Sequence, residues 1–166
     1  MPEISPKIRH RLEIQGFVDT DIDILAETAP WLRLAFGLCT VIAATGTVMG
    51  SPAILLGLAP IAALGAIFPV HPFDLIYNLG IRRFTGTHPL PRRGAPSRFA
   101  CGLGAVWLIG TAALFLEGIS LAGYILGGSL VAVGTLVATN HICIPSMIYR
   151  LLFGWPEQTM MRIKVR

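Results

Sequence analysis

Charge is scarce in this sequence. Only 13% of its 166 residues are Asp, Glu, Lys or Arg, whereas 54% are hydrophobic. Soluble domains carry roughly 25% charged residues, so this chain lacks the polar surface that a soluble domain of its size needs. The same hydrophobic content excludes a disordered or low-complexity chain. The composition therefore indicates an integral membrane protein, and the 18 Gly and 12 Pro fit that class, because both are more frequent in membrane helices than in soluble ones.

Motifs of known enzyme mechanisms are also missing from the sequence. The chain has no P-loop, dinucleotide-binding fingerprint, His-Glu-x-x-His zinc motif, nucleophile elbow or EF-hand. Its net charge of +4 would suit nucleic acid, but the basic residues surround apolar segments. We therefore expect a lipid bilayer as the partner, and no nucleic acid.

Two long segments that are almost free of charge are expected to cross the bilayer. Residues 34–73 contain no Asp, Glu, Lys or Arg, and residues 99–149 contain only Glu117. A spanning helix needs about 20 mostly apolar residues, so each segment is long enough for two, divided at 50–52 and at 117–120. The sequence predicts an all-α membrane protein with four transmembrane helices in two hairpins, at residues 32–49, 53–70, 99–116 and 121–139.

All 13 Lys and Arg residues lie on one predicted side of the membrane, outside the two hairpin turns. By the positive-inside rule, both termini and the 82–98 linker are cytoplasmic in a bacterial inner membrane. We predict a cytoplasmic arm at 1–30, a membrane domain at 31–155 and a basic tail at 156–166. The arm is either a solvated segment or a docking segment for a partner or the membrane surface.

The two hairpins resemble each other in sequence. Residues 33–38 and 98–103 share Arg, Ala, Gly and Leu at matching positions, and residues 71–77 align with 143–149. We predict two repeats, 31–84 and 97–155, related by an axis along the membrane normal, because a two-span unit returns the chain to its starting side.

The segment after each hairpin is expected to form a short interfacial helix on the cytoplasmic side. Its apolar residues recur with the spacing of an amphipathic helix. Tyr77, Tyr149 and Trp155 are predicted to lie at the lipid–water boundary, where aromatic side chains gather.

Several features together resemble an uncharacterised bacterial membrane protein family. They are the four predicted spans, the repeated arginine at the hairpin starts, the segment Pro-Arg-Arg-Gly-Ala-Pro-Ser-Arg-Phe-Ala at 91–100, and a Cys-containing segment that ends in Tyr149. That family is catalogued only as a domain of unknown function, so the resemblance implies a fold over residues 30–155 and no activity. The family often carries Cys-x-x-Cys in the last segment, where this chain has Cys143 and Ser146.

The cysteines and histidines are the residues best suited to chemistry. Cys39 and Cys101 are interpreted as small packed thiols. Cys143 lies two residues from His141, which would lower the thiol pKa of Cys143 if the two side chains met; the alternative is a packed structural thiol. No cofactor motif is present, but His71 and His141 are possible haem or metal ligands. His71, Asp74, His141 and Cys143 form a weaker zinc set.

Arginines and glycines supply the remaining candidate residues. Arg33 and Arg98 open the first and third spans and are expected to contact lipid phosphate, with an ion pair to Asp74 as the alternative. Two small-xxx-small patterns allow close helix approach, either within the bundle or to a neighbouring protein. Their residues are Gly46, Gly50, Gly123 and Gly127.

Three functions follow as hypotheses. The first is a non-catalytic accessory subunit of a larger bacterial membrane complex, such as a respiratory or photosynthetic one, with other membrane subunits as partners. The second is a thiol-redox or sulfur-handling membrane protein that uses Cys143 and His141. The third is a small transporter, which the lack of ionisable residues inside the spans disfavours.

Overall fold

The computed structural model describes residues 4–18 and 20–155. All regular secondary structure over these residues is helical, as the sequence predicts. The predicted basic tail at 156–166 lies outside the described residues. In order, the elements are α1 (Pro6–Ile14), α2 (Ile22–Thr28), η1 (Trp31–Arg33), α3 (Leu34–Val48), α4 (Pro52–Ile67), α5 (Asp74–Ile76), η2 (Tyr77–Ile81), α6 (Arg82–Thr85), α7 (Ala95–Leu116), α8 (Ser120–Asn140) and α9 (Ile144–Phe153).

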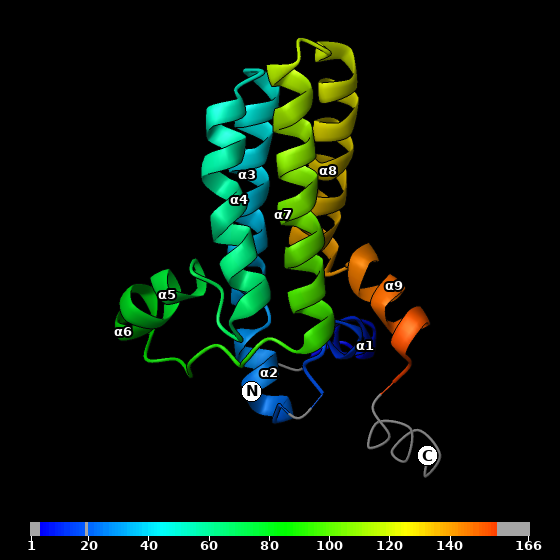
Figure 1. Ribbon diagram of the computed structural model, residues 1–166. Coiled ribbons are helices and arrows are strands. Elements are labelled where there is room, and N and C mark those ends of the chain that lie inside the picture. The colour runs from blue at the N-terminus through cyan, green and yellow to red at the C-terminus, as the bar shows by residue number, and fades with distance from the viewer. Residues whose placement is uncertain (1–3, 19, 156–166) are drawn as a thin grey trace.

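Helices α3, α4, α7 and α8 run side by side as an elongated bundle (Figure 1). Helix α3 packs on α8 and α4 packs on α7, so the two hairpins hold each other. Three segments are long and apolar enough to cross a membrane: Trp31–Val48, Ala95–Leu116 and Ser120–Asn140. They match three of the four predicted spans.

The fourth predicted span is not confirmed, because α4 is short. It has 16 residues, which is about 24 Å at 1.5 Å per residue, whereas the hydrocarbon core of a bilayer is about 30 Å thick. Its end is set by Pro69, because a residue that precedes proline is driven out of the helical region. Phe68 accordingly has an extended backbone, with φ −99° and ψ 148°.

Small side chains make the centre of the bundle tight. The main core cluster contains buried Ala43, Ala59, Ala62, Ala105 and Ala112 with Leu55, Leu58 and Leu108. Without much hydrophobic driving force between helices in lipid, association depends on close van der Waals packing, which small residues allow.

The N-terminal segment folds back against the bundle's own lower end, here called the base (Figure 1). Leu12 and Leu25 are buried in one cluster with Leu32, Tyr77 and Leu90. Arg150 of α9 donates to the carbonyls of Ile14 and Glu13, at 3.1 and 3.0 Å. The prediction of a solvated arm is therefore wrong for α1 and α2, because their apolar faces are covered by the same chain.

The predicted post-hairpin helices are present in different forms. Helix α9 exposes Leu151 and Leu152, and its interfacial position stays a prediction. After the first hairpin, the chain forms the short elements α5, η2 and α6 instead of one helix. Tyr77 is 0% exposed and stacks on Trp31 with ring centroids 5.1 Å apart, so its predicted place at the lipid–water boundary is wrong.

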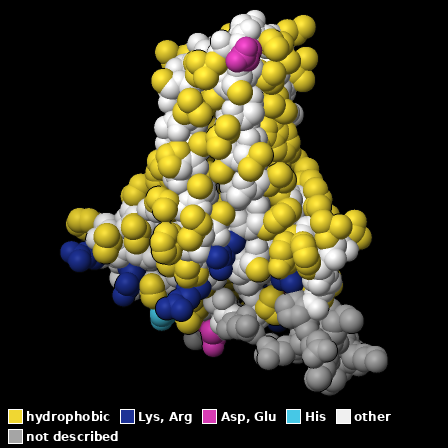
Figure 2. Space-filling view, in the orientation of Figure 1, with side chains coloured by type: hydrophobic (Ala, Val, Ile, Leu, Met, Phe, Trp, Pro, Cys, Tyr) yellow, Lys and Arg dark blue, Asp and Glu magenta, His cyan; other side chains and the backbone are white. Residues whose placement is uncertain are grey.

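Charged side chains are segregated along the bundle axis. Lys and Arg gather at the base, and the visible face above them is mainly hydrophobic (Figure 2). Within the four bundle helices the only charged residue is Arg98, in the first turn of α7.

Candidate functional site

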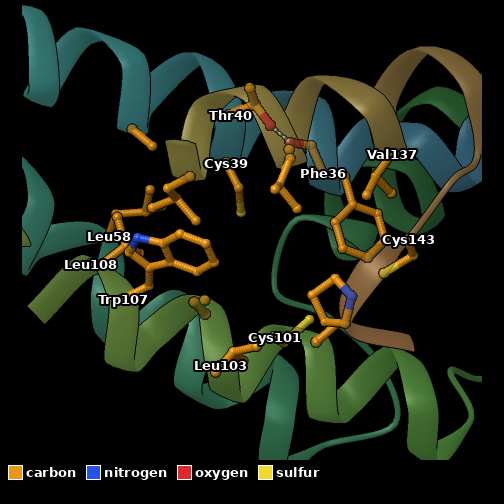
Figure 3. Close-up of a pocket in the computed structure, with 18 of the residues that line it drawn as sticks. Phe36, Cys39, Thr40, Leu58, Cys101, Leu103, Trp107, Leu108, Val137 and Cys143 are labelled. Carbon is orange, nitrogen blue, oxygen red and sulfur yellow. Dashed lines mark hydrogen bonds between the residues drawn. The ribbon is translucent and has the colours of Figure 1, made fainter. Parts of the chain in front are cut away.

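The three cysteines line one cavity between the bundle helices near the base (Figure 3). Cys39 lies in α3, Cys101 lies in α7, and Cys143 is the N-cap residue of α9. The cavity has a volume of about 100 Å³ and an almost entirely apolar lining, which includes Phe36, Leu58, Trp107, Leu108, Val137 and His71. All three thiols are free.

Cys143 is placed by the turn that joins α8 to α9. Helix α8 ends at Asn140, and the C-cap residue His141 has a left-handed φ of 56°. Ser146, three residues after Cys143, has its hydroxyl 3.0 Å from Cys143 Sγ and 3.1 Å from the carbonyl oxygen of Pro96. Burial raises the pKa of the Cys143 thiol, and hydrogen bonds from Ser146 oppose that increase. Cys143 is therefore a thiol at neutral pH with a donor already aimed at its sulfur.

His141 is engaged away from Cys143. Its Nε2 accepts a hydrogen bond of 2.6 Å from Arg33 Nε. Burial, followed by the charges of Arg33 and Arg11, lowers the pKa of His141 to about 4. The hydrogen-bond partner of Cys143 is Ser146, so the predicted Cys143–His141 pair is wrong.

His71 presents a neutral imidazole to the cavity. Its Nδ1 accepts from the Phe73 amide at 3.2 Å, which leaves the proton on Nε2, and Nε2 lies 3.9 Å from Cys39 Sγ. Burial, followed by the positive charge of Arg93, lowers the pKa of His71 to about 4. The ring packs so closely on α4 that a Cβ at Gly65 would lie 2.3 Å from its Cδ2, and hence glycine is needed there.

A buried ion pair lies beside the cavity. Arg93 donates from Nε to Asp74 Oδ2 at 2.7 Å and from Nη2 to Asp74 Oδ1 at 2.8 Å. The side chains are 1% and 3% exposed. Burial alone would lower the pKa of Arg93, but the hydrogen bonds and charge of Asp74 raise it. The guanidinium carbon also lies 4.9 Å from the ring centre of Phe36, which lines the cavity.

Arg98 caps a helix of the opposite hairpin, and Arg33 binds the side chain of the residue that follows one. Arg98 donates to the carbonyls of Ala66 and Ile67 at 2.9 and 2.6 Å, at the end of α4, and Arg33 reaches His141 at the end of α8. The alternative that either arginine pairs with Asp74 is wrong, because Arg93 holds that carboxylate. Their contact with lipid phosphate stays a prediction.

The family comparison agrees with the resemblance seen in the sequence. The family described as a domain of unknown function (DUF4395) matches residues 29–153. The chain belongs to this family. No curated protein and no solved structure matches the chain. Membership in DUF4395 indicates no activity, so the chemistry is argued from the residues of the site.

The predicted zinc set is not assembled in this DUF4395 chain. His71 and Asp74 lie together, whereas His141 is held by Arg33 and Cys143 by Ser146. Across residues 4–18 and 20–155, no group of three or more His, Cys, Asp or Glu side chains is placed to hold a metal ion. The prediction is wrong because the two segments that carry these residues bond to different partners.

The four glycines of the small-xxx-small patterns face neighbours in the same chain. A Cβ at Gly46 would lie 2.9 Å from Leu55 Cδ2, one at Gly123 2.8 Å from Phe115 Cε1, and one at Gly127 2.5 Å from Thr47 Oγ1. Gly50 turns the first hairpin with φ +56°, beside Tyr124. These positions serve internal packing, the first of the two alternatives, and the partner face predicted there is already filled.

Sequence reasoning missed three residues of the site. The sequence predicts packed thiols at Cys39 and Cys101, yet both line the cavity with Cys143. Their common position near the base ends of their helices was the available signal. No sequence signal marks Arg93 as buried, because its segment, Pro-Arg-Arg-Gly, has the composition of a solvated basic loop.

Proposed function

We propose that this protein is a small membrane protein that carries out thiol-redox or sulfur chemistry in the cavity lined by its three cysteines. The observation that carries the proposal is the convergence of Cys39, Cys101 and Cys143 on one cavity. They are the chain's only cysteines, and they come from three separate elements. Packing alone does not require three thiols around one empty space.

The surroundings of the cavity suit this chemistry. The small apolar cavity excludes water and bulky molecules, and its apolar wall holds buried thiols in the protonated form. The Nε2 proton of His71 and the hydroxyl of Ser146 are donors that can stabilise a sulfur anion when one forms. Arg93, next to Phe36, supplies the nearest buried positive charge.

We further propose that the protein spans a bacterial inner membrane with its base on the cytoplasmic side. The basic residues gathered at the base support this orientation. The matching positions of Arg33 and Arg98, each at the end of the other hairpin's second helix, support the predicted internal repeat. In this orientation the thiol cavity lies near the reducing side of the membrane, where disulfides are rare.

Reagent size provides the test of the thiol proposal. The full chain in detergent is treated with methyl methanethiosulfonate, which is small and neutral, or with a bulky charged maleimide, and modification is read by intact mass. We expect the small reagent to modify cavity cysteines and the bulky reagent to modify them only after unfolding. A Ser120→Cys variant, with its thiol at an exposed position, should react with both reagents. If all three native thiols resist the small reagent until unfolding, they are structural and the proposal fails.

A non-catalytic accessory subunit remains the second proposal. It is supported by large apolar side chains exposed at the base, such as Phe84 at 93% and Leu151 at 86%, which lipid or another subunit would cover. Copurification of defined partner subunits after mild solubilisation would support it. A monodisperse protein with no partner in its native membrane would contradict it.

A further inference from the structure

Ser146 stands where a second thiol would complete a Cys-x-x-Cys pair. It occupies the third position of α9, and its hydroxyl is 3.0 Å from Cys143 Sγ. A thiol there would attack Cys143 Sγ in a persulfide, displace the outer sulfur as hydrogen sulfide and close a disulfide with Cys143. A hydroxyl makes the same hydrogen bond but cannot form a disulfide. Cys143 therefore has a neighbour that stabilises a sulfur adduct without removing it.

The cavity beside Cys143 has room for a small adduct. Its volume of about 100 Å³ is smaller than the roughly 150 Å³ of an engineered apolar cavity that binds benzene. A persulfide extends a cysteine by one sulfur atom, which fits this space. A glutathione-sized thiol does not fit, and so a persulfide inside the cavity is protected from reduction by bulky thiols.

Charge near Cys143 favours an anionic sulfur adduct. A persulfide is more acidic than the thiol it comes from, so it needs donors or positive charge when buried. Ser146 donates to the sulfur, and Arg93 acts to lower the pKa of Cys143 against the effect of burial. Cys143 also occupies the N-cap position of α9, a helix of 10 residues, and such a terminus favours negative charge.

We propose that the cavity carries sulfane sulfur as a persulfide on Cys143, with small inorganic polysulfides as the donors. This inference rests on the proposed thiol function and names its substrate class. The Cys143 sulfur attacks the terminal sulfur of the polysulfide and forms a new S–S bond. The polysulfide's own S–S bond breaks, and its remainder leaves as a shorter polysulfide that takes the thiol proton. No oxidant is consumed, because the donor already holds sulfur at the required oxidation level.

The experiment loads the full chain in detergent with sodium tetrasulfide and removes excess donor. Intact mass then counts added sulfur atoms, and fragmentation locates them. We expect one retained sulfur on the peptide that contains Cys143 and none after treatment with sodium sulfide, which holds no sulfane sulfur. Cys143→Ser should abolish retention. Added sulfur spread equally over all three cysteines, or none at all, would overturn the proposal.

Position 146 gives a sharper test. In Ser146→Cys, the introduced thiol should attack the inner sulfur of the persulfide, form a disulfide with Cys143 and release hydrogen sulfide. The variant should therefore retain no sulfur and become resistant to alkylation at Cys143. Ser146→Ala should load but lose its sulfur faster, whereas Ser129→Ala, at an exposed serine of α8, should behave as the wild type. Sulfur retained in Ser146→Cys at the wild-type level would contradict the inference.

The two proposals can fail separately. If methyl methanethiosulfonate modifies the cavity cysteines but tetrasulfide leaves no sulfur on Cys143, the persulfide inference is wrong and the thiol function stands. If the cavity cysteines react with neither reagent, both are wrong.

Discussion

Arg93 and Asp74 form a bidentate ion pair, with guanidinium nitrogens 2.7 and 2.8 Å from the two carboxylate oxygens. The pair joins the loop before α7 to the first turn of α5, and both side chains are almost completely buried. A buried charge that loses its partner is strongly destabilising. The pair therefore holds the loop before α7 against α5 at the base, beside Phe36 of the thiol cavity.

Removal of one partner tests this role. Asp74→Asn keeps the side-chain size and leaves Arg93 without a counter-charge, so we expect the free energy of unfolding to fall by about 3–5 kcal/mol. Unfolding in detergent, followed by circular dichroism, measures the change. The double variant Arg93→Met with Asp74→Leu should lose less than Asp74→Asn alone. A wild-type midpoint for Asp74→Asn would show that the pair contributes little.

The lowered pKa values of the two buried histidines predict that the protein loses stability in mild acid. The pKa of His141 is about 4 in the folded protein and about 6.5 in an unfolded chain. Between these values the unfolded chain binds a proton that the folded chain does not. Stability is therefore complete above pH 6.5 and falls as the pH drops towards 4. We expect a loss on the order of 2 kcal/mol at about pH 5 from this residue.

The control for the acid effect is His141→Asn. Asparagine tolerates the left-handed backbone of this position and can accept from Arg33, but it does not titrate. Its midpoint of thermal unfolding should depend less on pH than that of the wild type. The remaining dependence is expected from His71, whose pKa is also about 4. An unchanged pH dependence in His141→Asn would contradict the assignment.

Two adjacent glycines on α8 provide a matched pair. A Cβ at Gly127 would lie 2.5 Å from Thr47 Oγ1, whereas one at Gly128 would meet nothing within 4 Å. We expect Gly127→Ala to destabilise the bundle by about 1–3 kcal/mol. Gly128→Ala should be neutral or stabilising by about 0.5–1 kcal/mol, because alanine favours a helix more than glycine does. Equal effects on the thermal midpoint would mean that α3 and α8 do not pack closely here.

Topology is tested with single cysteines in a background whose native cysteines are replaced by alanine. An impermeant maleimide applied to intact cells should label Ser120→Cys, at the hairpin end of the bundle, and leave Arg83→Cys, at the base, unlabelled until the membrane is opened. Both positions are exposed, so burial does not explain a difference. The reverse pattern would place the base outside the cell.

Hydropathy was enough to predict the helical hairpins, because long apolar runs with turn residues between them leave few alternatives. It failed where tertiary contacts decide. Composition gave no sign that the N-terminal segment folds under the bundle, since Leu12 is buried by residues far along the chain. The site was predicted only in part. Cys143 is there, but its partner is Ser146, and Cys39 and Cys101 join it through helix packing that spacing along the sequence does not reveal.

The most direct test of the central claim fills the cavity and measures thiol reactivity. Gly104 lines the cavity, and a Cβ there would meet nothing within 4 Å, so we expect the side chain of Gly104→Leu to take up cavity volume. The measured quantity is the rate constant for modification of Cys143 by methyl methanethiosulfonate. We predict a decrease of at least about tenfold in Gly104→Leu and a wild-type rate in Gly128→Leu, whose added side chain lies outside the cavity. Equal rates in all three proteins would show that the reagent does not reach Cys143 through this cavity, and would contradict the account.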